Sequence, residues 1–193
     1  MWFWTCSSAV EPPAHNGLVV GSNPTGSTTS ILNQEKGKVM NIFVLDTDPK
    51  KAAIQQIDKH IVKMPLESAQ MLCSALSRHG SEDTPYKATH KNHPCTLWAG
   101  ETRSNFKWLV THGIALCEEY TARYGKRHKC QDVIEWCSKN ASRIPEGKQT
   151  DFAQAMPVHY KRVSPVLAYR AYYKGDKSPI ASWKRNKPRW FAL

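Results

Sequence analysis

Acidic residues, long apolar runs and paired cysteines are all scarce in this chain of 193 residues. No apolar run approaches the roughly 20 residues that a membrane-spanning helix needs, and the apolar opening lacks the basic stretch of a secretion signal. The six cysteines show no paired spacing, so we expect reduced thiols and no disulfide framework. These absences argue against a membrane protein or a secreted disulfide-rich domain, and we expect a cytoplasmic protein without a membrane partner.

Positive charge is abundant and unevenly placed. The chain has 27 Lys and Arg against 16 Asp and Glu, a net charge of +11, and the whole excess lies after residue 39. The segment from residue 170 onward interleaves bases with aromatics and holds a single acid, Asp176. Such a segment favours a polyanionic partner, most simply a nucleic acid, over a protein that is merely basic. Its bases are Arg170, Lys174, Lys177, Lys184, Arg185, Lys187 and Arg189.

The first 39 residues differ in composition from the rest. They are rich in Ser, Thr, Gly, Pro and Asn and show no helical periodicity. Residues 21–24, Gly-Ser-Asn-Pro, can be encoded by a string that is similar to the T-arm of a tRNA gene. We therefore expect residues 1–39 to be an unstructured leader, a translated upstream sequence with the natural start at Met40, the alternative being a genuine flexible tail. Residues 40–193 are expected to form one domain.

Helical periodicity dominates after Met40. Residues 40–45 favour a short extended apolar piece, and Asp48 with Pro49 favours a helix start. We expect helix from residue 50 to 77, interrupted at Pro65, and further helices over 104–124, 131–139 and 166–174, with a last turn ending before Pro188. No other segment alternates like a strand. The sequence therefore predicts a mainly α, compact, single-domain fold with a short extended N-terminal piece.

A group of polar residues falls on one face of the first long helix. Lys63 lies three residues after His60, and Glu67 lies seven after it, so a helix places all three on one side. Charges beside an apolar stripe are most often a solvated helix face. The same interpretation applies to Glu118 and Glu119 on the helix over 104–124, whereas His112 there is expected to be a core histidine.

Motifs for nucleotides and metals are missing. There is no P-loop, GxGxxG or GxSxG. The metal-ligand types His90, His93, Cys95, His128 and Cys130 match no paired zinc signature. We expect no metal and no cofactor, and we interpret His90 and His93, which neighbour Lys87 and Lys91, as phosphate contacts.

One stretch resembles a known family. Asp58-x-His60, with Glu67 seven residues later, is similar to the first helix of the pyrimidine-dimer DNA glycosylases of the phage T4 endonuclease V type. Residues 66–70 resemble the Glu-x-Leu-x-Ala-Gln of bacterial relatives, Asn-His-Pro at 92–94 recurs in the family, and residues 185–191 resemble its closing Arg-Pro-x-Trp-Tyr. The chain from Met40 is also similar to small tailed-phage proteins that begin Met-Asn-Ile-Phe, which implies a host-cell cytoplasm.

The resemblance implies a compact all-α protein that holds kinked DNA and acts on a damaged or modified base. Glu67 would stabilise positive charge developing at the sugar C1′, and His60 would orient or contact DNA. The partner would be duplex DNA that contains a lesion, bound by a monomer. The expected nucleic-acid contacts are Lys87, His90, Lys91, His93, Arg170, Lys174, Lys184, Arg185, Lys187 and Arg189. The aromatic residues expected to stack on bases are Tyr172, Tyr173, Trp190 and Phe191.

The catalytic amine is the part of the family pattern that the sequence does not match. The best-known family member uses the α-amine exposed when the initiator Met is removed from before a Thr. In this sequence Asn41 follows Met40, and a bulky second residue predicts that the Met is retained. Lys63 is a substitute by position. The alternatives are a glycosylase without lyase activity, a non-catalytic DNA- or RNA-binding protein, and a phage DNA base-modification enzyme.

Overall fold

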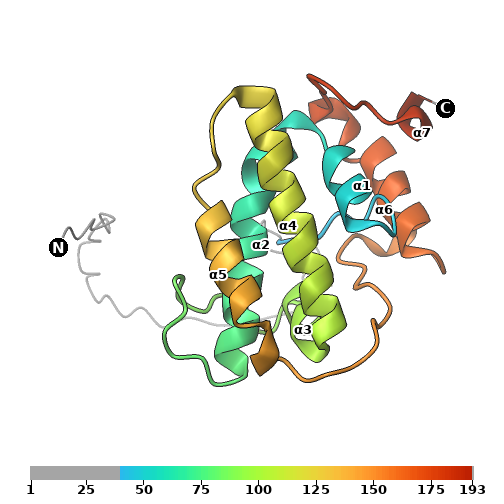
Figure 1. The fold of residues 1–193 in the computed structure, drawn as a ribbon. Coiled ribbons are helices and arrows are strands. Elements are labelled where there is room, and N and C mark those ends of the chain that lie inside the picture. The colour runs from blue at the N-terminus through green and yellow to red at the C-terminus, as the bar shows by residue number, and fades with distance from the viewer. Residues whose placement is uncertain (1–39, 193) are drawn as a thin grey trace, which may run out of the picture. The chain divides into compact units, whose positions relative to one another are not determined.

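The computed structural model describes residues 40–192, and within them the chain forms seven α-helices and no β-strand (Figure 1). The predicted mainly α fold is therefore confirmed, and the leader hypothesis for residues 1–39 lies outside the described residues. The helices are α1 (Pro49–Ile54), α2 (Asp58–Arg78), α3 (Pro94–Glu101), α4 (Arg103–Tyr124), α5 (Gln131–Lys139), α6 (Pro165–Lys174) and α7 (Arg189–Ala192). Single 3₁₀ turns cover Ala141–Arg143, Val158–Tyr160 and Ser178–Ile180. None of the described helices is both long and apolar enough to cross a membrane.

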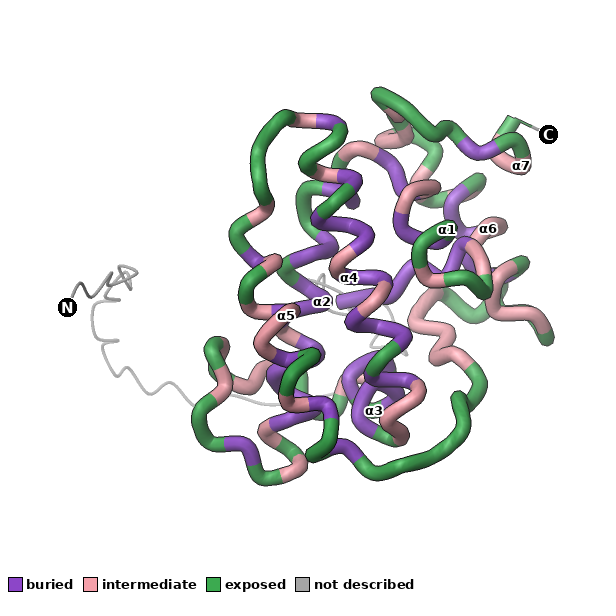
Figure 2. Tube along the Cα trace, viewed as in Figure 1, coloured by how far each residue is buried: buried purple, intermediate pink, exposed green. Residues whose placement is uncertain are grey.

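The core forms where α2 and α4 lie side by side (Figure 1), with α5 packed against both and α1 against α4. The facing sides of these helices are buried (Figure 2). Gly113 of α4 sits at the closest approach, because a Cβ there would lie 3.0 Å from Ile134 Cδ1 and 3.3 Å from Ser68 Cβ. The missing side chain therefore allows the three helices to pack at this spacing. The largest fully buried aliphatic side chains include Ile61, Met64, Met71, Leu72 and Leu76, all on α2.

The extended piece before α1 is buried and non-helical, as predicted. Residues 40–45 run through the interior, and Asn41 is held at both ends of its side chain. Its Nδ2 donates to the Ala155 carbonyl at 2.7 Å, and its Oδ1 accepts from the Tyr169 hydroxyl at 2.9 Å. Asp48 then caps α1, as predicted, by accepting from the backbone N–H groups of the next turn. This piece is thus fixed against α2 and α6.

The helix boundary predicted near Pro65 lies elsewhere. The chain breaks at residues 55–57, where Ile57 has an extended backbone (φ −62°, ψ 156°), and α2 then runs unbroken through Pro65. A proline inside a helix removes one backbone hydrogen bond. Pro65 is nevertheless buried, and the packing of α2 against its neighbours keeps the helix continuous. The break falls at 55–57 because the N–H of Asp58 bonds the Ser182 carbonyl, at 2.8 Å, outside the helix.

The later helices agree with the periodicity. Gly125 ends α4 in the left-handed conformation (φ 68°) that glycine adopts readily. The final turn differs from expectation, because Pro188 precedes α7 and its carbonyl accepts from the Phe191 N–H at 3.1 Å. A proline lacks the N–H that a helix start leaves unpaired, so it suits this position.

A buried charge cluster joins the end of α4 to the start of α2. The Arg123 side chain is 0% exposed, and its guanidinium donates to Glu119 Oε1 at 2.8 Å and to Asp58 Oδ1 at 2.9 Å. It also donates to the carbonyls of Gln56 and Ile54, each at 3.0 Å. The expectation that Glu119 is solvated was wrong, because this guanidinium neutralises it in the interior; Glu118 is exposed as expected.

The C-terminal segment docks on this Arg123 cluster. Asn186 Nδ2 donates to both carboxylate oxygens of Glu119, at 3.1 and 3.2 Å, and the Lys184 N–H donates to Asp58 Oδ1. Trp183 and Trp190 donate their indole N–H groups to Gln55, to its backbone carbonyl and its side-chain oxygen respectively. The segment is therefore tied by polar contacts to one end of α2 and α4.

Sulfur lies in the interior of the described chain. Cys73, Cys95, Cys117, Cys130 and Cys137 are all buried free thiols. Cys73 Sγ and Cys137 Sγ lie 3.7 Å apart.

Candidate active site

Glu67 is a nearly buried carboxylate in the middle of α2. Its side chain is 4% exposed, and Lys63, one turn earlier, places Nζ 2.8 Å from Oε1. The backbone N–H of Asn41 donates to Oε2 at 3.0 Å. The carboxylate is thus held from two sides, by an ammonium on its own helix and by a backbone nitrogen of the extended piece. The predicted association of Glu67 with Lys63 by helical spacing is what the structure shows.

This carboxylate lines a pocket of about 330 Å³. The volume lies near the lower end of the roughly 300–1,000 Å³ typical of small-ligand sites. Glu67 Oε1 is itself buried and makes no hydrogen bond of good geometry despite its short distance to Lys63, so its hydrogen-bonding capacity is unused. The lining residues are Met40, Lys63, Leu66, Glu67, Gln70 and His90.

Met40 and Asn41 are site residues that the sequence did not reveal. Met40 lines the pocket, and Asn41 presents its backbone nitrogen to the carboxylate. Asn41 and Glu67 are 26 residues apart, so no periodicity connects them. Only the family's use of an N-terminal amine pointed to this end of the chain.

His60 lies outside the pocket lining. It is buried, its Nδ1 is 2.6 Å from the Tyr173 hydroxyl, and its ring stacks on Phe43 at 4.3 Å. Burial, with smaller contributions from the charges of Lys177 and Lys63, lowers the pKa of His60 from 6.5 to about 3. His60 is therefore a neutral side chain that joins α2 to α6. His112 is likewise buried, as expected, and burial lowers its pKa to about 3.

The lowered pKa of His60 predicts loss of stability in mild acid. Its folded pKa of about 3 lies below the ordinary 6.5, so protons bind the unfolded chain first as the pH falls below 6.5. Between pH 7 and pH 5, the free energy of unfolding of the wild type is expected to fall by about 2 kcal/mol more than that of His60→Asn. Urea denaturation at the two pH values measures this, with the exposed His159→Asn as the matched control. Equal losses in His60→Asn and wild type would contradict the prediction.

The predicted phosphate contacts fall in two places. His90 lines the Glu67 pocket, and Lys87 and Lys91 lie exposed in the same loop. His93 caps α3, accepting from the Cys95 N–H at 3.2 Å, and burial lowers its pKa. The loop between α2 and α3 thus carries predicted residues to the pocket and its rim.

The C-terminal bases lie at the other end of α2. Lys184 Nζ lies over the Tyr124 ring, 4.3 Å from its centre, and Arg185 Nε lies 3.6 Å from Glu119 Oε1. Their docking point, Asp58, precedes Glu67 by nine residues, or about 13 Å of helix. The structure therefore does not bring the tail and the Glu67 pocket into one cavity. Lys187 and Arg189 are exposed on the same segment.

The residues of α6 are partly committed to packing. Arg170 donates to the Leu45 carbonyl at 2.9 Å and lies over the Trp190 ring. Lys174 is exposed in the last turn of α6. Tyr173 is fully buried against His60, and Tyr172 is 8% exposed.

The two aromatic residues of α7 are less buried. Trp190 and Phe191 are half-buried, and Phe191 packs edge-on against Trp183. Of the four aromatics expected to stack on bases, these two expose the most surface.

Metal-ligand types do not gather in the described part of the chain. Among residues 40–192, no three His, Cys, Asp or Glu side chains are arranged to hold a metal ion. His128 and Cys130 instead make local contacts, the Cys130 N–H donating to His128 Nδ1 at 3.2 Å.

The position of the Glu67 pocket coincides with a sequence match. The family model for pyrimidine dimer DNA glycosylase matches residues 40–132. No curated protein and no solved structure matches the chain. The matched region, just under half of the chain, is therefore similar to the pyrimidine dimer DNA glycosylases and supports the resemblance noted from the sequence.

The match to the glycosylase family covers every residue that lines the pocket. It begins at Met40 and runs through α2 and α4 into the start of α5. It does not reach α6 or the C-terminal segment, so the likeness of residues 185–191 to the glycosylase ending lies outside it.

Proposed function

We propose that the chain is a DNA glycosylase that releases a damaged pyrimidine base from duplex DNA, with Glu67 as its catalytic carboxylate. One observation carries this proposal. Glu67 is a buried carboxylate that lines a pocket and lies 3.0 Å from the backbone nitrogen of Asn41, within the region similar to pyrimidine dimer glycosylases. The net charge of +11 supports a polyanionic substrate. The monomeric state, phage origin and cytoplasmic location stay predictions.

The chemistry of base release suits this arrangement. Breaking the bond between the base and C1′ develops positive charge on the sugar, and a fixed carboxylate stabilises that charge. The interaction is stronger in a buried site than in water because the surroundings screen it less. Asn41 and Lys63 hold the carboxylate in place before substrate binds, so little reorganisation is needed. A base must leave the stack to reach such a pocket.

We further propose that the active form begins at Asn41 and is produced by proteolysis after Met40, since removal of an initiator Met from before Asn41 is not expected. In the full chain the nitrogen beside Glu67 belongs to a peptide bond and cannot act as a nucleophile. Removal of everything up to Met40 would turn the same atom into an α-amine next to the carboxylate. An α-amine titrates roughly 2.5 units below a lysine side chain, so more of it is neutral at pH 8. Both amines would lie beside Glu67, so this difference in ordinary pKa makes the α-amine a better candidate than Lys63.

Removal of residues 1–40 is expected to allow the protein to form a covalent complex with DNA that borohydride traps. A chain released from a cleavable fusion with Asn41 as its first residue should form a borohydride-stable complex with duplex DNA that contains a thymine dimer or an abasic site. The full chain should form no such complex, because its nitrogen at Asn41 is an amide. Denaturing electrophoresis of the trapped product measures both.

Two further results would assign the amine. Trapping that survives Lys63→Met in the chain beginning at Asn41 supports the α-amine, whereas trapping lost in that variant assigns the role to Lys63. If neither form releases a base from any lesion duplex but both bind DNA, the glycosylase proposal is wrong and the protein is a binding module.

A further inference from the structure

A second pocket adjoins the Glu67 pocket across α2. It has a volume of about 460 Å³ and shares Lys63 and Leu66 with the first. We call it the loop pocket, because half of its lining residues belong to the connection between α4 and α5. Its lining residues are Val62, Lys63, Leu66, Tyr86, Tyr120, Lys126, Arg127, His128, Lys129 and Cys130.

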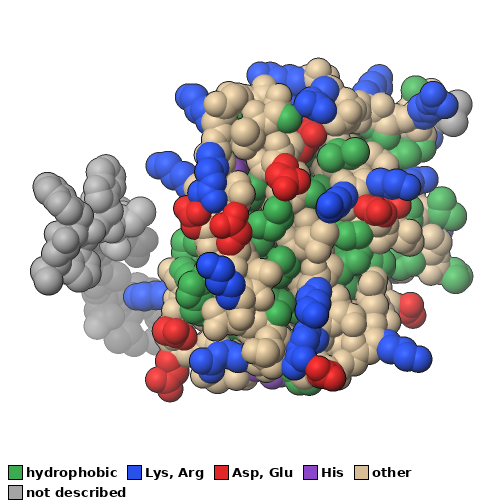
Figure 3. Space-filling model, in the orientation of Figure 1, with side chains coloured by type: hydrophobic (Ala, Val, Ile, Leu, Met, Phe, Trp, Pro, Cys, Tyr) green, Lys and Arg blue, Asp and Glu red, His purple; other side chains and the backbone are tan. Residues whose placement is uncertain are grey.

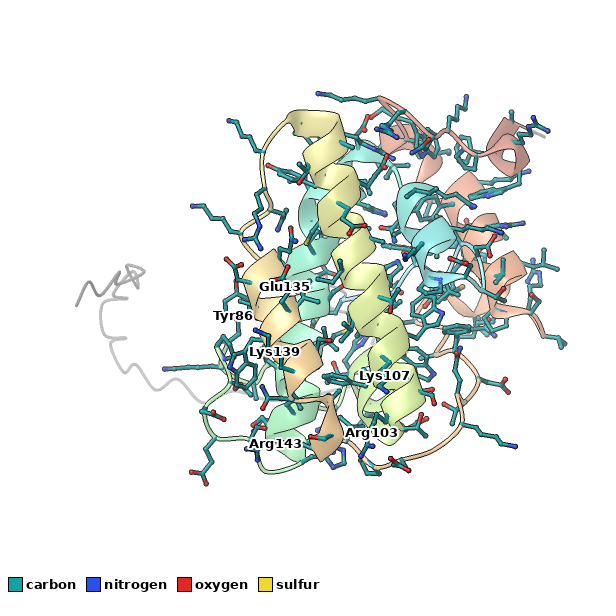
Figure 4. All side chains as sticks on the ribbon, viewed as in Figure 1. Tyr86, Arg103, Lys107, Glu135, Lys139 and Arg143 are labelled. Atoms are coloured by element: carbon teal, nitrogen blue, oxygen red, sulfur yellow. The ribbon has the colours of Figure 1, made fainter. Side chains whose placement is uncertain are left out.

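The backbone of this connection is fastened to α2. The His128 ring donates from Nε2 to the Val62 carbonyl at 3.1 Å, because its Nδ1 already accepts from the Cys130 N–H. The ring also packs edge-on against Tyr120 at 4.8 Å. On the other wall, the Tyr86 hydroxyl lies 3.6 Å from Cys130 Sγ. Specific side-chain contacts therefore hold the walls of the loop pocket in place. Figure 4 shows Tyr86 beside α5.

Two lysines of the connection take part in no ion pair. Arg127 is paired with Asp132 at 2.6 Å and with Glu135 at 3.4 Å, so its positive charge is already offset by these two carboxylates. Lys126 and Lys129 are exposed, and no acidic partner pairs with either among residues 40–192. Figure 3 shows basic side chains along this connection, with acidic ones of α5 just below.

The floor between the two pockets is apolar and open. Val62 is 47% exposed and Leu66 is 37% exposed, although both lie on a core helix. A pocket that combines this apolar surface with these two lysines fits a chain of sugars and phosphates, because sugar faces can cover the apolar surface while phosphates meet the lysines. An apolar peptide would leave both charges without a partner.

We propose that the loop pocket binds the backbone of the DNA strand whose base enters the Glu67 pocket, with Lys126 and Lys129 each contacting one phosphate. The inference rests on the proposed glycosylase function and adds the path of the substrate strand. The proposed path is supported by the continuity of the two pockets, since Lys63 and Leu66 line both.

The salt dependence of binding tests the two contacts. With the full chain and a fluorescent duplex containing one thymine dimer, Lys126→Ala/Lys129→Ala should reduce the steepness of log K against log salt by about 1.8, or about 0.9 for each lost phosphate contact. Lys50→Ala/Lys51→Ala is the matched control, because these exposed lysines lie on α1, away from the connection (Figure 1). An unchanged slope in Lys126→Ala/Lys129→Ala, or an equal loss in the control, would overturn the proposal.

Neutral phosphates identify the strand. Methylphosphonate linkages placed singly on either side of the dimer should weaken wild-type binding, and the same linkages should cause no further loss in Lys126→Ala/Lys129→Ala. If only linkages in the opposite strand weaken binding in a way that depends on Lys126 and Lys129, the proposed path is wrong. Cleavage of the bond between the base and C1′ is measured separately, on the same duplex, with the chain that begins at Asn41. If binding shows this coupling but the chain that begins at Asn41 cleaves no such bond, the glycosylase function alone is contradicted, whereas cleavage without coupling contradicts only the strand path.

Discussion

Replacing Glu67 with Gln is expected to lower the rate of base release by about 10²–10³-fold, the range seen when one fixed stabilising group is removed from an active site. The amide oxygen of Gln can still accept from the Asn41 N–H, so the extended piece should stay in place. The negative charge is lost, and with it the stabilisation of positive charge at C1′. Single-turnover cleavage of the bond between base and C1′ in a thymine-dimer duplex, by the chain beginning at Asn41, measures the effect. It is read as strand breaks after alkali treatment, because the cleaved base stays joined to its neighbour through the dimer.

Two controls separate catalysis from folding and binding. Glu118→Gln removes an exposed carboxylate of α4 and should leave base release unchanged. The affinity of Glu67→Gln for the same duplex, measured by fluorescence anisotropy, should not fall, because a carboxylate opposes phosphate binding. Base release by Glu67→Gln within a few-fold of the wild type would remove the basis for the catalytic assignment.

Replacing Arg123 with Met is expected to lower the free energy of unfolding by about 3–5 kcal/mol, as in other buried ion pairs that lose one partner. The guanidinium is fully buried and contacts Glu119, Asp58 and two backbone carbonyls. Met fills much of the volume but leaves the Glu119 carboxylate, 4% exposed, without its buried counter-charge, and the half-exposed Arg185 at 3.6 Å replaces only part of it. Urea denaturation at pH 7 measures the loss.

The matched control is Arg143→Met. Arg143 is exposed just after α5 (Figure 4), and its replacement should change stability by no more than about 0.5 kcal/mol. Adding Glu119→Gln to Arg123→Met should recover part of the loss, because it removes the unpaired charge. A loss below about 1 kcal/mol in Arg123→Met would show that water reaches the Arg123 cluster.

The fold was predictable wherever a helix has a sustained apolar face. The helices over 104–124 and 131–139 follow from periodicity and, for the first, from the glycine that ends it. The break at residues 55–57 was not predictable, because its cause is a hydrogen bond from Asp58 to Ser182, far along the chain. The interruption expected at Pro65 was wrong because the local propensity of proline yields to tertiary packing.

The site was predictable only within one helix. The pairing of Lys63 with Glu67 follows from their i, i+4 spacing. Spacing also placed His60 on that face, but it could not reveal that Phe43 and Tyr173 cover it. The contact of Asn41 with Glu67 joins segments that only the folded chain brings together.

The burial of sulfur makes a chain that begins at Asn41 suited to spectroscopy. Cys6 is then no longer present, and the five remaining thiols are all buried, Cys130 in the wall of the loop pocket being 5% exposed. A single cysteine introduced at an exposed position would be far more open to a maleimide dye or a spin label than any of them. Distances between labelled protein and labelled DNA can therefore be measured without first removing the native cysteines.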